Sequence, residues 1–232
     1  MKIDQLQLPA GDLAAHRDFY ESVLGLPVLS EAPGKLVLQA GASRLTFEQA
    51  PPGGGGVYHF AFNIPEDRFG EAKQWVSHRV ALIKNNAGED EFNFTHWNAH
   101  SLYFYDPAGN ILEFIARHDL AGGSTRTPFG GQSLLSISEV GLATEDVAAT
   151  LHSMQDQLGV GIYDGAGSDT FTAVGDVHGL FIVVKQGRIW FPDTGKQAEL
   201  LPVTVQVTPD TGEHYILSGP PYQPYALGML GL

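Results

Sequence analysis

One stretch of the chain, Phe94–Phe114, gathers the residue types that could carry out chemistry. It reads FTHWNAHSLYFYDPAGNILEF and places two histidines, His96 and His100, ahead of a single glutamate, Glu113. Glu113 lies in an apolar run, where a carboxylate is costly to bury unless it is paired or coordinates a metal ion. The residue is therefore either a metal ligand or a solvated side chain on a half-exposed strand.

A tight turn in the same stretch sets how its two strands align. Asp106–Gly109 has Asp at the first turn position, Pro at the second and Gly at the fourth, which is strong turn chemistry. If Gly109 adopts the left-handed conformation, the turn is a three-residue hairpin loop with a bulge. That loop places Tyr103 opposite Glu113, with the hydroxyl near the carboxylate. A four-residue loop would instead place Leu102 opposite Glu113.

Composition narrows the chemistry further. The chain has 232 residues, 43% hydrophobic and 17% charged, which is typical of a globular protein with one large or two small domains. It contains no cysteine, so any metal must be held by His, Glu, Asp or Gln. The net charge of −13 argues against nucleic acid and anionic membranes as partners and would suit a cationic ligand or simply solubility. The expected partner is a small-molecule substrate. With no signal-like start and no apolar run of membrane-spanning length, a cytoplasmic location is expected.

The elements that must position these residues repeat along the chain. Residues 1–50 begin with the alternating strand KIDQLQL, continue with a helix between Asp12 as N-cap and Gly25, and end with three short strands. A flexible link, PPGGGG, follows, and residues 57–118 then repeat the same order. Each unit is predicted to be one βαβββ module.

A third repeat is predicted beyond a second link. Residues 121–134 are rich in Gly, Ser, Thr and Pro and are expected to form a linker. Residues 135–208 then show a strand, a helix and further strands, which indicates a third, degenerate βαβββ module. Residues 209–232 are rich in Pro, Gly and Tyr and are expected to be an irregular tail. The expected class is therefore α+β, with the paired modules in residues 1–120.

The order of elements and two sequence segments resemble a known superfamily. DLAAHRDFYESVLGLPV (12–28) and YDPAGNILEF (105–114) are similar to segments of the vicinal oxygen chelate superfamily. That superfamily contains glyoxalase I, fosfomycin-resistance thiol transferases, bleomycin-resistance proteins and type I extradiol dioxygenases. The resemblance covers residues 1–118 well and 135–208 in outline. It implies paired modules that curl into a cupped, mixed sheet around one divalent ion, and it leaves homodimerisation open.

The resemblance also implies a set of metal ligands. Glu113 follows D-P-x-G, where the family has a ligand carboxylate, and His59 opens the second module at another ligand position. Gln5 holds the matching position in the first module, where most members carry His and eukaryotic glyoxalase I uses Gln. Glu48 is a further ligand candidate, with Thr46 on the same strand face as its competitor. No residue is assigned to an organic cofactor.

The donor types indicate which ion is expected. Gln, His and Glu suit Fe(II) or Mn(II), with Zn(II) or Ni(II) if the protein is glyoxalase-like. In the third module Glu139 sits where a ligand would sit in the first strand, but no partner His or terminal Glu follows in the right place. That module is therefore interpreted as a degenerate copy that packs against the other two.

The opening stretch is also similar to the extradiol dioxygenase signature. That signature runs His, a short gap, an aliphatic residue, Tyr, two residues, D-P-x-G and then Glu. The chain supplies His96, Leu102–Tyr103, Asp106–Gly109 and Glu113 in this order. Phe94 departs from the pattern, because the family prefers a small or β-branched residue there.

The signature implies catalytic roles for two residues. His96 would act as the acid/base on substrate, and Tyr103 would donate a hydrogen bond to the catecholate. The alternative for His96, with Trp97 and His100, is a surface strand of aromatic residues without a catalytic role.

Three functions follow, in order of preference. The first is a divalent-metal-dependent enzyme that resembles type I extradiol, ring-cleaving dioxygenases. The second is a glyoxalase I or fosfomycin-resistance-like lyase or thiol transferase, with Gln5, Glu48, His59 and Glu113 on the metal. Few basic residues are available there to hold an anionic thiol cofactor. The third is a metal-free small-molecule binding protein of the bleomycin-resistance type.

Overall fold

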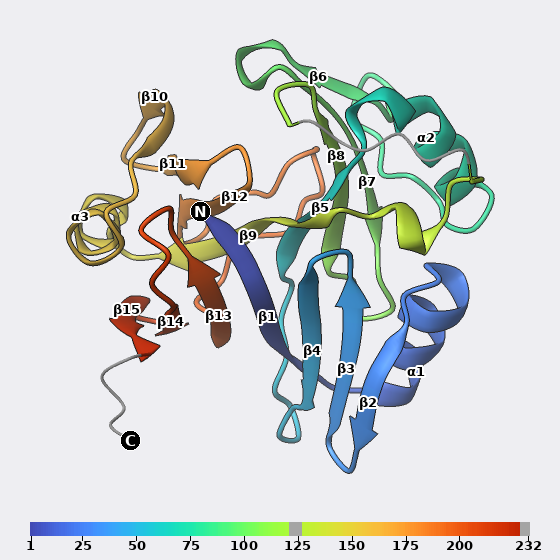
Figure 1. Cartoon of the computed structure of the whole chain (residues 1–232), viewed down its shortest axis with the longest axis horizontal. Coiled ribbons are helices and arrows are strands. Elements are labelled where there is room, and N and C mark those ends of the chain that lie inside the picture. The colour runs from blue at the N-terminus through green and yellow to red at the C-terminus, as the bar shows by residue number, and fades with distance from the viewer. Residues whose placement is uncertain (121–126, 228–232) are drawn as a thin grey trace.

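The computed structural model describes residues 1–120 and 127–227 (Figure 1). The first module contains one helical segment, α1 with its continuation η1, and four strands that follow the expected order: β1 (Lys2–Ala10), α1 (Leu13–Arg17), η1 (Asp18–Val23), β2 (Val28–Ala32), β3 (Lys35–Ala40) and β4 (Ser43–Gln49). Asp12 caps the helix by accepting from the Ala15 N–H at 2.9 Å, and Gly25 follows with a φ of 67°. The local signals for this module are therefore confirmed.

The second and third modules repeat the same order. The second comprises β5 (His59–Ile64), η2 (Glu66–Arg68), α2 (Phe69–Ser77), β6 (Phe92–Phe94), η3 (Thr95–Trp97), β7 (Ala99–Tyr105) and β8 (Ile111–Arg117). The third comprises β9 (Ser136–Thr144), α3 (Val147–Leu158), β10 (Ile162–Gly167), β11 (Phe171–Asp176) and β12 (Gly179–Lys185). The third module is thus a complete βαβββ unit that ends at Lys185.

The C-terminal part of the chain differs from the expectation. β13 (Val203–Thr208) does not complete the third module, because it pairs antiparallel with β1 of the first module. β14 (Tyr215–Gly219) and β15 (Gln223–Ala226) extend this ladder. The prediction of an irregular tail is therefore wrong for these residues. Part of the predicted linker, residues 121–126, lies outside the described residues, and η4 (Gly131–Ser133) lies in the rest of it.

The fifteen strands of the described residues join in one mixed sheet. Within each module the first strand runs parallel to the last, as in β1 with β4, β5 with β8 and β9 with β12. Between modules the first strands pair antiparallel, β5 with β9. β1 pairs with β13 on one side and, at Ile3–Ile137, with β9 on the other, so β9 of the third module lies between the first strands of the other two modules (Figure 1). This order decides which side chains can meet.

Side chains alternate between the two faces of the sheet. Phe60 and Phe62 of β5 and Phe114 of β8 lie in the main hydrophobic core, together with residues of α2 and α3. The residues between them, such as Ala61 and Ile115, point to the opposite, concave face. None of the described helices is both long and apolar enough to cross a bilayer.

Candidate metal centre and active site

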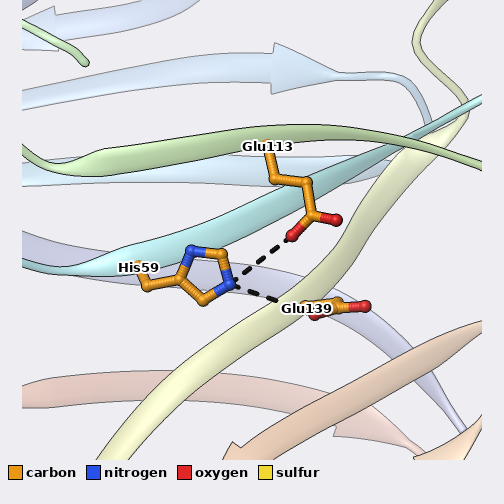
Figure 2. Close-up of side chains that lie close together, drawn as sticks. All are labelled: His59, Glu113 and Glu139. Atoms are coloured by element: carbon orange, nitrogen blue, oxygen red, sulfur yellow. Dashed lines mark ion pairs between the residues drawn. The ribbon is translucent and has the colours of Figure 1, made fainter. Parts of the chain in front are cut away.

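Three buried ionisable side chains meet on the concave face of the second and third modules (Figure 2). His59 comes from β5, Glu113 from β8 and Glu139 from β9. Nε2 of His59 lies 3.6 Å from Oε2 of Glu113 and 4.0 Å from Oε2 of Glu139. One ligand atom from each residue lies within 4.8 Å of the others. Among the described residues, these three form the one group of His, Asp and Glu side chains that lie close enough together to share an ion.

Strand register explains why these three residues converge. Ala61 pairs with Glu113 on one side and with Glu139 on the other. Paired residues share a sheet face, and His59 shares it too because it lies two residues before Ala61. The small alanine side chain leaves the space between the two carboxylates open. The site is therefore a direct consequence of the order β8–β5–β9.

The backbone fixes the orientation of the His59 ring. Nδ1 lies 3.1 Å from the carbonyl oxygen of Ile111, and only a protonated Nδ1 can donate to that acceptor. Nε2 then presents a lone pair toward the two carboxylates. Burial lowers the pKa of His59 to about 4, so the ring is neutral at ordinary pH. A neutral imidazole held by a backbone carbonyl is the usual state of a histidine metal ligand.

The two carboxylates are held in an environment that a cation would stabilise. Burial raises the pKa of Glu113 well above its usual range, and the charge of Glu139 raises it further. Burial also raises the pKa of Glu139, although Arg117 opposes this effect and donates from Nη2 to Oε1 of Glu139. Two buried carboxylates at this separation repel each other when both are ionised, and a divalent ion removes the repulsion.

The donor separations fit a divalent ion. Bonds from such an ion to nitrogen and oxygen are about 2.0–2.2 Å, so two ligands lie about 3.0 Å apart at right angles and about 4.2 Å apart when opposite. The separations of 3.6 and 4.0 Å from Nε2 of His59 lie within these limits. Three protein donors leave further coordination positions open toward the cavity, which is typical of catalytic rather than structural sites.

A cavity of about 410 Å³ opens above the three donors. Its wall is largely aromatic and comes from the second and third modules and the segment after β12: Phe94, Trp97, Tyr103, Phe171, Trp190 and Phe191. Trp190 lies over the His59 ring with the centroids 5.3 Å apart. A cavity with this volume and wall suits a small planar ligand.

Both predicted catalytic residues line this cavity. Tyr103 of β7 pairs with Glu113, as the three-residue loop predicts. Burial, followed by the charges of Glu113 and Glu139, raises the pKa of Tyr103 well above its ordinary value, so the hydroxyl stays protonated. His96 belongs to the short helical turn η3 instead of a strand, and its side chain is exposed at the cavity.

The hairpin before Glu113 has the predicted geometry. Gly109 has a φ of 80°, and its N–H donates to the Asp106 carbonyl at 3.0 Å. Oδ1 of Asp106 accepts from the N–H groups of Ala108 and Asn110, each at 2.9 Å. The turn therefore fixes the register that brings Glu113 to the site.

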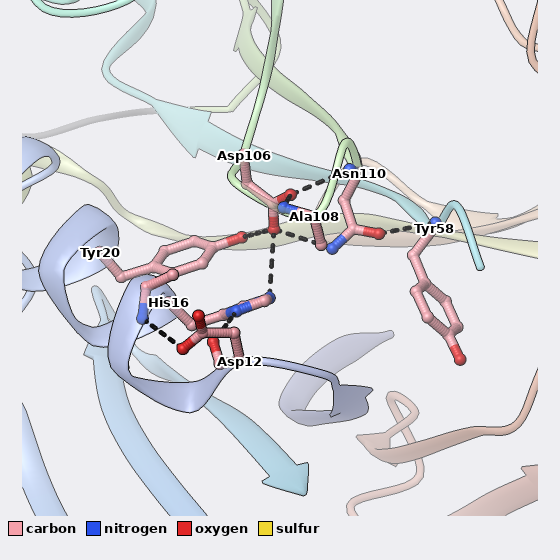
Figure 3. Close-up of polar contacts among 8 residues, drawn as sticks. Asp12, His16, Tyr20, Tyr58, Asp106, Ala108 and Asn110 are labelled. Carbon is pink, nitrogen blue, oxygen red and sulfur yellow. Dashed lines mark hydrogen bonds and ion pairs between the residues drawn. The ribbon is translucent and has the colours of Figure 1, made fainter. Parts of the chain in front are cut away.

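The same turn is tied to the first module and to β5 (Figure 3). Oδ2 of Asp106 accepts from the Tyr20 hydroxyl at 2.9 Å and from Nδ2 of Asn110 at 2.8 Å. Oδ1 of Asn110 accepts from the Tyr58 N–H at 2.9 Å, directly before His59. The network thus holds the starts of β5 and β8 in one arrangement.

Two predicted ligands lie elsewhere. Gln5 pairs with Arg44 and Gln206, and Glu48 forms an ion pair with Lys35 at 2.9 Å. The structure does not bring Gln5 together with His59, because the strand beside β5 is β9 and not β1. Gln5 and Glu48 also do not meet, since Arg44 lies four residues before Glu48, about 13 Å along the strand.

Sequence reasoning missed the third member of the cluster, although a signal was present. Glu139 holds the ligand position in the first strand of its module, which is the place that Gln5 and His59 hold in theirs. No partner His or terminal Glu follows it within its own module, so that module's pattern alone does not predict a site. Its partners come from the neighbouring module, across the β5–β9 pair. For Arg117 the sequence offers no comparable signal.

Comparisons with known proteins agree with this architecture. Residues 2–114 match the family described as Glyoxalase/Bleomycin resistance protein/Dioxygenase superfamily. A comparison with curated protein sequences found no match.

Two solved structures share the fold over nearly the whole chain. A candidate dioxygenase from Bacillus subtilis is 15% identical, with a TM-score of 0.63, over 97% of this chain and 84% of its own. A single-site variant of glyoxalase I from Zea mays is 14% identical, with a TM-score of 0.56, over 97% of this chain and 92% of its own. At these identities the likeness concerns the fold alone. Residues 2–114, which include the strands that carry His59 and Glu113, belong to the glyoxalase/bleomycin resistance protein/dioxygenase superfamily, as the resemblance to vicinal oxygen chelate proteins predicts.

Proposed function

We propose that this protein is a divalent-metal-dependent enzyme of the ring-cleaving dioxygenase type that acts on a small aromatic vicinal diol. The observation that carries the proposal is one cavity in which His59, Glu113 and Glu139 form the floor and Tyr103 and His96 line the wall. Fe(II) or Mn(II) is the expected ion, because nitrogen and carboxylate donors suit both.

Three donors would hold the ion: Nε2 of His59, Oε2 of Glu113 and Oε2 of Glu139. When bound, the ion would act as a Lewis acid that binds two neighbouring oxygens of the substrate. Glu139 takes the place of the second histidine in the two-His-one-carboxylate set of non-haem iron oxygenases. The proposed ligand set therefore has the same number of ligands, three, but a negatively charged glutamate replaces one neutral histidine.

The chain's own residues would orient the substrate and move its protons. The Tyr103 hydroxyl, held protonated by burial, would donate a hydrogen bond to a substrate phenolate oxygen. His96, exposed at the cavity, would accept the proton of the second hydroxyl and return it later. The aromatic wall would stack on the ring and exclude water.

A glyoxalase-type isomerisation is the second candidate, and the two carboxylates favour it. A glutamate with a raised pKa, such as Glu113, suits proton transfer at a carbon atom. Against it stands the ligand pattern, because Gln5 and Glu48 lie outside the cluster. Arg188 is also the one lysine or arginine that lines the cavity within the described chain, which leaves little to bind an anionic thiol.

Oxygen uptake tests the proposal. Ring cleavage places both atoms of one O₂ in one product and needs no external reductant. Purified protein, loaded anaerobically with Fe(II) or Mn(II), is expected to consume oxygen in a one-to-one ratio with one member of a panel of catechols. His96→Ala should lower turnover by about 10²–10⁴-fold while metal content stays constant.

A matched control distinguishes a catalytic effect from a general one. His100 lies in the same stretch but bonds to His118 and packs on Phe69, and it does not line the cavity. His100→Ala is therefore expected to keep most of the activity. Full activity in His96→Ala would show that the dioxygenase assignment is wrong. Isomerisation of a hemithioacetal without oxygen uptake would support the glyoxalase type instead.

A further inference from the structure

A charged side chain lies behind the proposed metal site without reaching the cavity. Arg117, the last residue of β8, is 1% exposed and is the bulkiest of the fully buried side chains in the described chain. It shares the concave face with Glu113, four residues earlier on the same strand. It is absent from the cavity lining, whereas Trp97 and Glu139 line it. Arg117 can therefore act on a bound ligand only through its neighbours.

Its contacts single out one carboxylate oxygen. Nη2 donates to Oε1 of Glu139, and Nε donates to Oγ of Ser138 at 3.2 Å. The guanidinium carbon lies 5.5 Å from the ring centroids of both Trp97 and Tyr163. Among the described residues, Nη1 has no hydrogen-bond acceptor and Glu139 is the ion-pair partner. Oε2 of Glu139, the other oxygen, faces His59 at 4.0 Å.

Stability alone gives a weak reason for this arrangement. The desolvation of two charges offsets most of their attraction, and an apolar pair of similar volume is often at least as stable. Arg117 also leaves one donor group unsatisfied, which adds to the cost. The placement of the pair against a candidate ligand is therefore its informative feature.

The charges of a loaded site can be counted from these contacts. Metal ligands bind deprotonated, so Glu113 and Glu139 contribute one negative charge each and His59 contributes none. With a divalent ion these ligands give a neutral site, and Arg117 raises the total to one positive charge. Two histidines and one carboxylate around the same ion also give one positive charge. The Glu139–Arg117 pair thus has the charge of a neutral ligand.

We infer that Arg117 is a positioning residue that orients Glu139 as a metal ligand and gives the Glu139–Arg117 pair the net charge of a neutral one. It occupies Oε1, so Glu139 offers the ion one oxygen in a fixed orientation. Its charge also keeps the loaded site at one positive charge, which favours a singly deprotonated vicinal diol over a neutral one. The inference rests on the metal site of the proposed function.

Two binding measurements test this role without any turnover. Calorimetric titration gives the affinity for Co(II), and the visible absorbance of 4-nitrocatechol gives the affinity of the loaded protein for a monoanionic diol. Arg117→Met should bind Co(II) about tenfold more tightly and 4-nitrocatechol about tenfold more weakly. One carboxylate bridges the arginine and the ion, and a charge that close changes binding by at least about tenfold at an effective dielectric of about 20.

Matched variants separate charge from packing. Arg117→Lys keeps the charge and should keep both affinities within about threefold. Arg117→Met combined with Glu139→His restores one positive charge and should restore 4-nitrocatechol binding. Glu139→His alone leaves Arg117 uncompensated and should bind Co(II) at least about tenfold more weakly than the double variant. If Arg117→Met alone fails to fold, the comparison of Glu139→His with the double variant still tests the role of Arg117.

The outcomes distinguish this inference from the proposed function. Equal Co(II) and 4-nitrocatechol affinities in the wild type and Arg117→Met would overturn the role of Arg117 while the metal site stands. Equal Co(II) affinities in Glu139→His and the double variant would overturn it as well. Failure of the wild-type protein to bind Co(II) would overturn both proposals. Normal binding without oxygen uptake would overturn the dioxygenase assignment alone.

Discussion

The buried carboxyl group of Glu113 should make the metal-free protein less stable as the pH rises. Burial, followed by the charge of Glu139, raises the folded-state pKa of Glu113 well above its ordinary value of 4.5. Between those two pKa values the folded chain holds a proton that the unfolded chain has released. The free energy of unfolding therefore falls with pH in this window, because the folded state binds more protons than the unfolded state.

The size of the effect follows from one retained proton. Each pH unit lowers the free energy of unfolding by about 1.4 kcal/mol until the pH passes the raised pKa of Glu113. Glu113→Gln has no proton to retain, so it lacks this slope. His59, whose folded pKa is about 4, affects stability as the pH falls below about 6.5, in both proteins alike. Glu139, whose pKa burial also raises, adds a slope in both proteins, so the difference between them reports the proton retained at Glu113.

Urea unfolding in EDTA at pH 5.5, 6.5 and 7.5 measures this difference. The stability of the wild type relative to Glu113→Gln should fall as the pH rises, by up to about 1.4 kcal/mol for each unit below the raised pKa of Glu113. Saturating metal should reverse the trend in the wild type, because the ion binds the deprotonated carboxylate. Glu48→Gln, at a half-buried glutamate outside the cluster, is the control and should run parallel to the wild type. Parallel profiles for Glu113→Gln and the wild type would refute the reasoning.

Two further substitutions test the supports of the site. Asn110→Ala removes the amide that links the turn to the Tyr58 N–H, and urea unfolding should show a loss of about 1–3 kcal/mol. Gly141→Ala places a Cβ 2.6 Å from the Trp190 ring, so metal affinity measured by calorimetry should fall. Gly161→Ala, where nothing lies within 4 Å of the new Cβ, is its control, and equal affinities in the two variants would contradict the packing argument.

Local chemistry made much of the fold predictable. Caps such as Asp12 and Gly25 mark the first helix, and the turn at Asp106–Gly109 has its predicted form. Because the turn determines register, the Tyr103–Glu113 pair followed from sequence alone. Short-range hydrogen bonds and steric preferences act between residues that are close in the chain, so their signals can be read there.

The identity of the third ligand could not be predicted in the same way. Gln5 and Glu139 hold equivalent positions in the first strands of their modules. Which of these strands lies beside β5 depends on long-range pairing, and the sequence pattern does not encode that choice. The strands of the C-terminal tail have a similar origin, since β14 and β15 are ordered by pairing through β13 with β1, and composition alone does not predict that pairing.

The most direct measurement is the number and affinity of divalent ions bound by four proteins. The wild type should bind one Co(II) per chain in the calorimeter. Gln5→Ala should bind it equally well, whereas His59→Ala and Glu139→Gln should bind it at least about tenfold more weakly, because the first loses one of three ligands and the second replaces a charged ligand with a neutral one. Loss of binding in Gln5→Ala, or full binding in Glu139→Gln, would contradict the account of the site.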